Sequence, residues 1–325
     1  MLFSRFTHYG GVYIIALILG LCTAEAVGFA QHSIHASPLG EAQAITATAV
    51  DSISDCDFSI LSWNIYMLPG YTFMNIGQKK RADRIARVLL ESHKKHDVIV
   101  FSEAFHKAAR RRIWRQLKDI FPYQAGPLNK GGFLKTNGGV WILSRTPLHF
   151  LGQIKFEDCA GADCWARKGA LLVETEKNGH RYQIVGTHLQ ADEDERRDSI
   201  RVRQYRAIRD ELLVRYQTAG VVQLVCGDMN TLPESTTYAP MQQLLGANDG
   251  HLTGNMQVSW PTLDFCKANQ KPCFLYDYIL IKPNGQHIAK SERQLHAFRR
   301  AWKQHKNMVK HDLSDHYGIE MQLWW

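Results

Sequence analysis

The amino-acid sequence predicts an α/β protein, and three observations lead to this fold class. Strand-like and helix-like segments alternate from Phe58 to the C-terminus. The composition is that of a globular protein, with 45% apolar and 22% charged residues. No repeat of the period found in solenoids or propellers occurs, so residues 56–325 are expected to fold as one domain.

The N-terminal segment is expected to lie outside this domain. An apolar run over residues 11–22 follows positively charged residues and precedes a small-x-small pattern at 24–26. These features are typical of a signal peptide over residues 1–26, cleaved between 26 and 30, with a polar tether over 27–55. The run is shorter than the ~20 residues that span a bilayer, and a retained N-terminal anchor is the alternative. We therefore expect a secreted or periplasmic protein.

Each predicted strand carries an Asn, Glu, His or Asp residue at or near one of its ends. Residues 58–64 alternate between apolar and polar like a half-buried strand. Residues 97–103 form the continuous apolar run that is typical of a strand buried on both faces. Further strands are predicted at residues 182–187, 221–226, 274–281 and 319–323.

Two amphipathic helices are predicted at residues 78–93 and 197–216, where apolar side chains recur at helical spacing. The basic stretch 107–118 is either a helix that faces phosphate or lipid, or a helix with one solvated face whose Ile113, Trp114 and Leu117 point inward. The formal charge of the chain is +8, which favours an anionic partner. Charge alone does not choose between nucleic acid and a membrane surface.

The cysteines fit an exported protein. Cys159 with Cys164 and Cys266 with Cys273 each close a short loop, which predicts two local disulfides in an oxidising compartment. Zinc ligation is the alternative, but neither pair has the two-residue spacing or the neighbouring histidines of a structural zinc site. Cys226 lies in an apolar run and is expected to be a buried thiol.

The polar residues at the strand ends form a candidate active site, because active sites gather where strand ends converge. One such residue is ordinarily a cap or a turn former, but this set consists of residues that bind metals or transfer protons. Carboxylate and amide oxygens suit Mg²⁺, with Mn²⁺ or Ca²⁺ as alternatives. Two histidines can transfer protons near neutral pH. Together these groups suit metal-assisted hydrolysis of a phosphoester. The set is Asn64, Glu103, His188, Asp228, Asn230, Asp277 and His316.

The motifs around these residues resemble a known superfamily. In chain order they read LSWN, SEAF, GTHL, GDMN, YDYI and SDHYG. In this order they are similar to the endonuclease/exonuclease/phosphatase superfamily, which includes pancreatic deoxyribonuclease. The resemblance implies a deoxyribonuclease-I-like, four-layer α/β/β/α sandwich of two packed mixed sheets. We expect a monomer.

Within that superfamily, three segments resemble the neutral and bacterial sphingomyelinases. They are residues 63–69, residues 186–191 and the pattern Asp163-x4-Lys168-Gly169. This resemblance implies a secreted, Mg²⁺-dependent phosphodiesterase of the phospholipase C type. Such an enzyme hydrolyses sphingomyelin to ceramide and phosphocholine at a phospholipid membrane surface.

The resemblance also implies roles for the metal and phosphate ligands. Asn64 and Glu103 would hold the principal cation. Asp228 and Asn230 would position the scissile phosphate or a second cation, alongside His188.

The remaining roles concern proton transfer and phosphate contact. His316 would be the general base, and Asp277 would orient it by a hydrogen bond. Asp315 would either polarise the site or cap the strand turn. Lys168, with Asp163 in the same motif, would approach the phosphate, and a solvated lysine in a turn is the alternative.

One feature of some bacterial sphingomyelinases, a long aromatic hairpin, is not obvious in this chain. The stretch 260–274 stands in its place and is short. The aromatic residues that could contact a membrane are Trp260, Phe265, Phe274, Trp324 and Trp325, and a place in the core is the alternative for the first three.

Two other functions are weighed against this one. A secreted nuclease of the same fold would share most of the catalytic set and would take nucleic acid as its partner. The positive charge favours it, but no arginine-rich loops are evident beside the strand ends. The other alternative is a catalytically dead effector that binds membranes.

Overall fold

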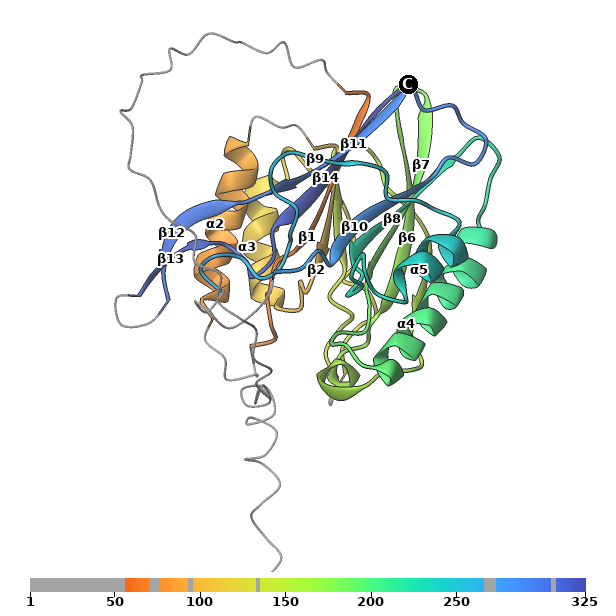
Figure 1. The fold of residues 1–325 in the computed structure, drawn as a ribbon. Coiled ribbons are helices and arrows are strands. Elements are labelled where there is room, and N and C mark those ends of the chain that lie inside the picture. Colours follow the sequence, from red (N-terminus) through yellow and green to blue (C-terminus); the bar gives the residue numbers. More distant parts are fainter. Residues whose placement is uncertain (1–55, 71–75, 93–95, 133–134, 266–272, 305–307) are drawn as a thin grey trace, which may run out of the picture. The chain divides into compact units, whose positions relative to one another are not determined.

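Two β-sheets pack face to face in the computed structural model (Figure 1). The structure describes residues 56–70, 76–92, 96–132, 135–265, 273–304 and 308–325. The first sheet has seven strands, in the order β3 (Tyr123–Ala125), β4 (Trp141–Ser144), β2 (Val98–Ser102), β1 (Phe58–Asn64), β14 (Gly318–Trp324), β11 (Lys290–His296) and β9 (Leu252–Thr253). The second has five strands, in the order β10 (Asp277–Lys282), β8 (Val222–Asp228), β7 (His180–His188), β6 (Gly169–Lys177) and β5 (His149–Lys155).

The alternation of side chains along each strand gives both sheets two apolar faces. In β1, Phe58 and Ile60 belong to the core between the sheets, whereas Leu61 and Trp63 belong to the core on the opposite face. All residues of β1 are buried, so the expectation of a half-buried strand is wrong. The expectation assumed that the polar side chains of this strand face solvent. Ser59, for example, is buried, and its hydroxyl donates to Glu320 at 2.8 Å.

Helices cover the outer face of each sheet (Figure 1). On the first sheet these are α2 (Gln78–Glu91) and α3 (Lys107–Leu117), and on the second α4 (Glu195–Ile208) and α5 (Tyr238–Leu245). The order helix, sheet, sheet, helix confirms the predicted four-layer α/β/β/α sandwich. Both sheets are mixed, since β1 pairs parallel with β2 and antiparallel with β14, and β7 pairs parallel with β8 and antiparallel with β6.

Two helices refine the predictions. The basic helix α3 buries Ala109, Ile113 and Leu117 and exposes Arg112 and Arg115, which confirms the interpretation of one solvated face. The helix predicted at 197–216 begins earlier and ends in a different geometry. It starts after Asp194, whose carboxylate accepts the backbone N–H of Arg197 at 2.8 Å, and it continues as the π-helical segment η2 (Arg209–Val214).

A small third sheet was not predicted. It pairs β12 (Arg299–Lys303) with β13 (Val309–Asp312) directly before Asp315 and His316. Its side chains are mostly basic and exposed, but Trp302 is fully buried and its indole N–H donates to the Asp312 carbonyl at 2.9 Å. The short 3-10 helix η1 (Gly161–Trp165) was not predicted either.

The cysteine predictions have mixed outcomes. Cys159 and Cys164 form a disulfide, as expected, and Cys226 is fully buried in β8. Cys273 is a free, exposed cysteine, which contradicts the predicted disulfide with Cys266. Cys266 itself lies outside the described residues, as do residues 1–55 with their predicted signal peptide and tether. None of the helices in the described part of the chain has the length and hydropathy needed to cross a membrane.

The terminal tryptophans lie far from the predicted site. Trp324 ends β14, the strand whose opposite end follows His316. The indole of Trp325 donates to the Tyr182 hydroxyl at 2.7 Å and stacks on His180. Their contacts therefore anchor the end of the last strand.

Candidate active site

Three buried side chains form a row across one end of the second sheet. His188 ends β7, Asp228 ends β8 and Asp277 begins β10. The strand register places His188 opposite Asp228 and Asp228 opposite Asp277. Since β10 runs antiparallel to β8, its first residue meets the last residue of β8.

The first sheet brings three more of the predicted residues to the same place. Asn64 ends β1, Glu103 follows β2 and His316 precedes β14. The Asn64 amide donates to Glu103 at 3.3 Å and to Asp228 at 3.0 Å, which connects the two sheets. The structure thus brings together the strand-end residues that the sequence singled out.

The backbone is unusual at two of these residues. Glu103 has a φ of 52° and Asn230 a φ of 48°, in the left-handed region that residues other than glycine rarely adopt. The conformation at Glu103 is fixed by backbone bonds from Met67 N–H to its carbonyl at 3.0 Å and from Ala104 N–H to Gly139 at 2.8 Å. Such conformations concentrate at functional sites.

His316 is held by Asp277. The Nδ1 atom of His316 donates to the Asp277 carboxylate at 2.7 Å, which leaves Nε2 facing Asp228 at 3.6 Å. Burial alone would lower the pKa of His316, but the carboxylates of Asp277 and Asp228 raise it to about 10. Asp277 therefore fixes the orientation of the imidazole ring.

Lys168 contacts His188 from the other side of the row. Its ammonium lies 3.0 Å from Nε2 of His188 and donates to the Leu189 carbonyl at 2.8 Å. Burial, together with the charges of Lys168 and His316, lowers the pKa of His188 well below its ordinary value. Lys168 is 6% exposed, so the alternative of a solvated lysine is wrong.

Asp163 positions this lysine. One carboxylate oxygen lies 2.7 Å from the Lys168 ammonium, and the other accepts the backbone N–H of Ala191 at 2.7 Å. Because Asp163 lies in η1, the disulfide between Cys159 and Cys164 closes the loop that carries it.

The oxygen atoms of Glu103 and Asp228 suit a divalent cation. Burial and the charge of Asp315 raise the pKa of Glu103 to about 7, and burial and Asp277 raise the pKa of Asp228 to about 6. The second carboxylate oxygen of Glu103 is buried and has no hydrogen-bond partner among the described residues. Crowded buried carboxylates with an unpaired oxygen are stabilised by a hard cation.

Asp228, Asp277 and His316 also bring possible metal-ligand atoms close together. Single atoms of Asp228, Asp277 and His316 lie within 4.8 Å of one another. The hydrogen bond between Asp277 and His316 accounts for the closeness of these two residues without a metal ion.

Asn230 and Asp315, the last two predicted residues, lie next to Asp228 and Glu103 respectively. The backbone N–H of Asn230 donates to Asp228 at 3.0 Å, and its side-chain amide donates to Leu189 at 3.3 Å. Asp315 accepts the Ser314 hydroxyl at 3.3 Å and is close enough to Glu103 to raise the pKa of that carboxyl. Its carboxylate therefore acts on the site electrostatically.

Sequence reasoning missed Arg81, which is fully buried. Its guanidinium donates to the carbonyls of Ile65 and Leu313 at 2.8 Å each, and it also binds the Tyr66 carbonyl. It thereby ties the loop after β1 to the loop before His316. Nothing in the sequence distinguishes this arginine from the solvated charges on the same helix.

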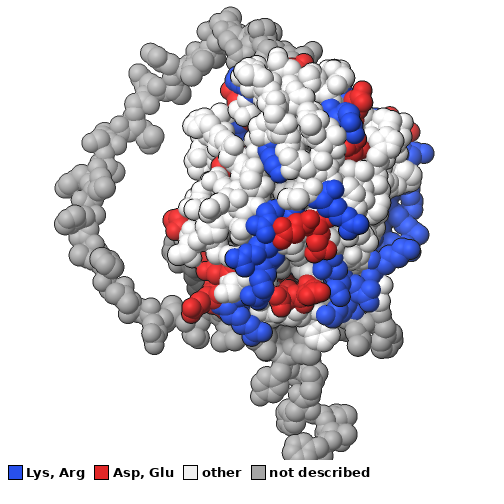
Figure 2. Space-filling model, turned by 90° about the vertical axis from the view of Figure 1, so that its right-hand side faces the viewer, with Lys and Arg blue, Asp and Glu red and all other residues white. Residues whose placement is uncertain are grey.

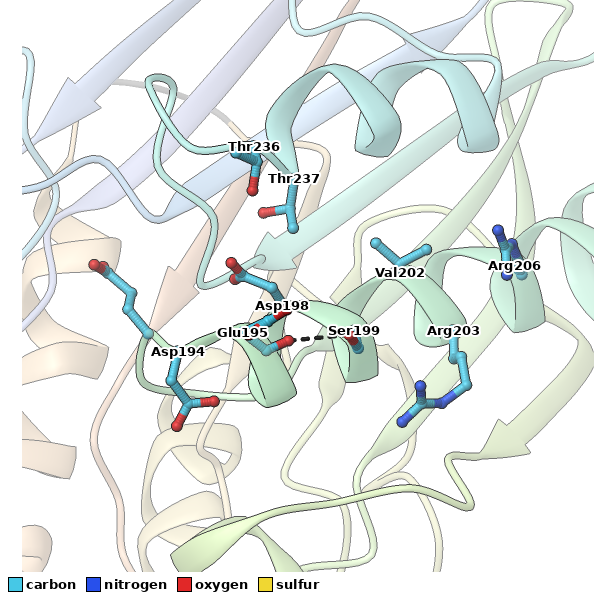
Figure 3. A pocket seen from close by; sticks show the side chains of 10 residues that line it. Asp194, Glu195, Asp198, Ser199, Val202, Arg203, Arg206, Thr236 and Thr237 are labelled. Carbon is cyan, nitrogen blue, oxygen red and sulfur yellow. Dashed lines mark hydrogen bonds between the residues drawn. The ribbon is translucent and has the colours of Figure 1, made fainter.

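An open pocket lies along α4 (Figure 3). Its lining comes from α4, from Glu193 and Asp194 before it and from the loop that leads into α5, and includes Asp198, Arg203 and Thr237. On the α4 and α5 side of the domain, acidic and basic side chains are interspersed in the lower part of the face (Figure 2).

The chain is similar in sequence to proteins of one known family. The model of the Endonuclease/Exonuclease/phosphatase family matches residues 61–316. Sphingomyelinase C of Leptospira interrogans is 30% identical over 319 residues, which are 88% of this chain and 55% of that protein. Sphingomyelinase C of Listeria ivanovii is 28% identical over 291 residues, 81% of this chain and 85% of that protein. The chain spans 39% to 55% of the length of the Leptospira relatives it matches.

A solved structure gives a similar picture. A mutant beta toxin of Staphylococcus aureus with bound magnesium ions superposes with a TM-score of 0.73 at 26% sequence identity. The match covers 82% of this chain and 99% of the toxin. The deoxyribonuclease-I-like architecture is thus shared over nearly the whole described domain.

Proposed function

The chain belongs to the endonuclease/exonuclease/phosphatase family, and from this premise we propose that it is a divalent-metal-dependent phosphodiesterase that hydrolyses sphingomyelin to ceramide and phosphocholine. One observation carries the proposal. The imidazole of His316, which a carboxylate holds through Nδ1, lies beside Asp228. The side-chain amide of Asn64 links the same Asp228 to Glu103.

Glu103, Asn64, Asp228 and Asn230 would hold the cation. When bound, it would supply positive charge against the scissile phosphate and against the carboxylates that raise the pKa of His316, and so would lower that pKa until Nε2 is free to accept a proton. Magnesium is the proposed ion, because the donors are oxygens and a structural relative carries it, with Mn²⁺ or Ca²⁺ as alternatives.

The protein's own residues would move the proton. Nε2 of His316 faces the centre of the site, where it can accept a proton from an attacking water. Asp277 keeps Nδ1 protonated, so that Nε2 is the accepting atom, and it stabilises the imidazolium that forms.

His188 and Lys168 would contact the phosphate. The buried ammonium supports His188 at 3.0 Å and brings a positive charge to the side of the row away from Asp277. His188 can offer a ring N–H to a phosphate oxygen, and the ammonium of Lys168, whose three N–H groups are engaged by His188, Leu189 and Asp163, adds positive charge as negative charge builds up on the phosphate.

Export through an N-terminal signal peptide over residues 1–26 belongs to the same proposal. The disulfide between Cys159 and Cys164 supports it, since disulfides form and persist in oxidising compartments. Sphingomyelin would then be met at an external membrane surface by a monomeric enzyme.

The test compares two substrates of different class. Purified protein is incubated with sphingomyelin vesicles or with plasmid DNA, each with Mg²⁺ or with a chelator. Release of phosphocholine that stops with the chelator is expected, without nicking of the plasmid. Rapid DNA cleavage without phosphocholine release would instead identify a nuclease. Lipid binding without hydrolysis of either substrate would identify a catalytically dead effector.

A further inference from the structure

Three aromatic side chains form a partly exposed wall at the edge of the proposed site. They are Trp260, Phe274 and Tyr276, whose ring centroids lie 5.4 to 6.2 Å apart. The indole of Trp260 lies 6.4 Å from the imidazole of His316. The wall therefore borders the general base directly, on the β10 side of the row. The steps proposed above for metal, proton and phosphate leave these rings without a role.

The wall is held rigidly by the backbone. Trp260 and Phe274 exchange backbone hydrogen bonds at 3.0 and 2.6 Å. The Ser259 hydroxyl accepts the backbone N–H of Tyr276 at 3.0 Å, and the Tyr276 carbonyl accepts the N–H of Met229 at 2.8 Å. Since Met229 lies between Asp228 and Asn230, the position of the wall is fixed to the metal ligands.

A negative charge accompanies the rings. The Tyr276 hydroxyl donates to the carboxylate of Glu193 at 2.5 Å. The neighbouring Asp192 and Asp194 pair with Arg197, whereas Glu193 forms no ion pair with the described residues and has this neutral hydroxyl as its partner. Aromatic faces and an exposed carboxylate thus meet at one place beside the catalytic histidine.

We infer that this wall binds the trimethylammonium group of the phosphocholine head group. The inference rests on the proposed function and adds a substrate preference to it. A quaternary ammonium has no N–H to donate, so proteins bind it through aromatic faces by cation–π attraction. A short ethylene link joins its nitrogen to the phosphate, so a phosphate beside His316 places the ammonium within reach of Trp260.

A primary ammonium head group tests this assignment. Phosphoethanolamine carries the same charge and the same link but is a strongly hydrated hydrogen-bond donor. The wall should therefore favour sphingomyelin over ceramide phosphoethanolamine, whereas the metal centre and His316 should treat the two phosphates alike. Glu193 would attract both cations, so the aromatic rings are what discriminate.

The experiment measures kcat/KM on both lipids in matched vesicles for the wild type and for Trp260→Leu, which keeps apolar bulk and removes the aromatic face. We expect roughly a tenfold loss on sphingomyelin and less than about a threefold loss on ceramide phosphoethanolamine, as the removal of one desolvated cation–π contact implies. Trp260→Phe, which retains a ring, should recover most of the preference. Phe150→Ala is the matched control, because Phe150 is 59% exposed on β5 away from the row.

A binding probe completes the test without relying on lipid turnover. Phosphocholine should protect the wild type against thermal unfolding more strongly than phosphoethanolamine at equal concentration, and Trp260→Leu should abolish that difference. Equal losses on both lipids, or an unchanged difference in protection, would overturn the head-group site. If the wild type releases phosphocholine while Trp260→Leu keeps the wild-type preference, only this inference fails. If the wild type cleaves neither lipid, the proposed function itself fails.

Discussion

At the scale of single residues, the pair formed by His316 and Asp277 is the most informative feature of the site. Asp277 acts through His316, since its carboxylate holds the imidazole at 2.7 Å. Under the proposed function, Asp277 is therefore a positioning residue and His316 is the base. A positioning residue has a kinetic signature that a merely structural one lacks.

His316→Ala should lower kcat for sphingomyelin by about 10²–10⁴, because it removes the base. Asp277→Asn should lower kcat in the same direction. The double variant should be no worse than His316→Ala alone, since the two residues act as a unit. Steady-state phosphocholine release at saturating Mg²⁺ measures all three, and circular dichroism checks the fold.

The control is Asp83→Asn, at an exposed aspartate that pairs with Arg112 on the surface. It should keep wild-type turnover. Additive losses in the double variant would show that Asp277 works independently of His316.

The strand-end residues could be predicted because each one lies next to a recognisable apolar run in the sequence. Asn64, Glu103 and Asp228 directly follow apolar runs, so local sequence was sufficient to select them. The burial of Lys168 and the bridging role of Arg81 could not be predicted. Both depend on carbonyls and carboxylates supplied by distant segments, and no local pattern reports those contacts.

At the scale of elements, the loop closed by the disulfide positions a side chain of the site as well as crosslinking the chain. The bond between Cys159 and Cys164 closes η1, which carries Asp163. The side chain of Gln190 fastens the same loop by two bonds to Ala160, at 2.8 and 3.1 Å. The loop thus fixes the lysine beside His188.

Replacing both cysteines, Cys159→Ser with Cys164→Ser, should lower kcat/KM at 25 °C roughly tenfold, because misplaced catalytic groups cost about this much or more. The closed loop is short, so the expected loss of stability is only about 2 kcal/mol. Lipid assays and calorimetry on the same preparation separate the two effects. Asp163→Asn, with the disulfide intact, should reproduce the kinetic loss. Full activity in the double variant would show that the loop does not need its bond.

Element predictions succeeded where apolar runs were continuous and failed where tertiary contacts override composition. The runs ending at Glu103 and Asp228 became β2 and β8. The strand predicted at 274–281 begins only at Asp277, because Phe274 and Tyr276 belong to the aromatic wall. The hairpin β12–β13 was not predicted, because most of its side chains are basic or exposed. The buried Trp302 stabilises it through a hydrogen bond to the Asp312 carbonyl, a contact that no local pattern reports.

At the scale of the whole domain, a buried carboxylate in the first sheet links four segments. Glu320 in β14 accepts hydrogen bonds from Ser59 at 2.8 Å and Gln322 at 3.2 Å. Its oxygens lie 3.2 Å from His96 and 2.7 Å from His296. Although burial alone would raise it, these hydrogen bonds and the two histidines hold the pKa of Glu320 far below its ordinary value.

The sign of the resulting pH dependence is fixed. A carboxyl whose pKa is lower in the folded than in the unfolded state stabilises the fold above the unfolded pKa of about 4.3, and this stability is lost as the pH falls below it. Glu320→Gln should therefore lower the free energy of unfolding at pH 7 by about 2–3 kcal/mol. Its acid destabilisation between about pH 5 and pH 3 should be shallower than that of the wild type.

Urea unfolding in the presence of chelator measures this across the pH range and keeps the metal site out of the comparison. Glu292→Gln, at an exposed position on β11, is the matched control. Parallel pH profiles for wild type and Glu320→Gln would mean that other carboxylates dominate acid unfolding.

The antiparallel pairing of β14 with β1 has a consequence for the timing of synthesis. The Ser314 hydroxyl donates to the Asn64 carbonyl at 2.7 Å, across 250 positions of sequence. A nascent chain that has completed β10 already carries Asn64, Glu103, His188 and Asp228, but it has no base until the segment before β14 emerges and joins the first sheet. The proposed hydrolytic centre is thus incomplete in a chain that stops before Ser314, and we expect such a truncated chain to release no phosphocholine from sphingomyelin vesicles.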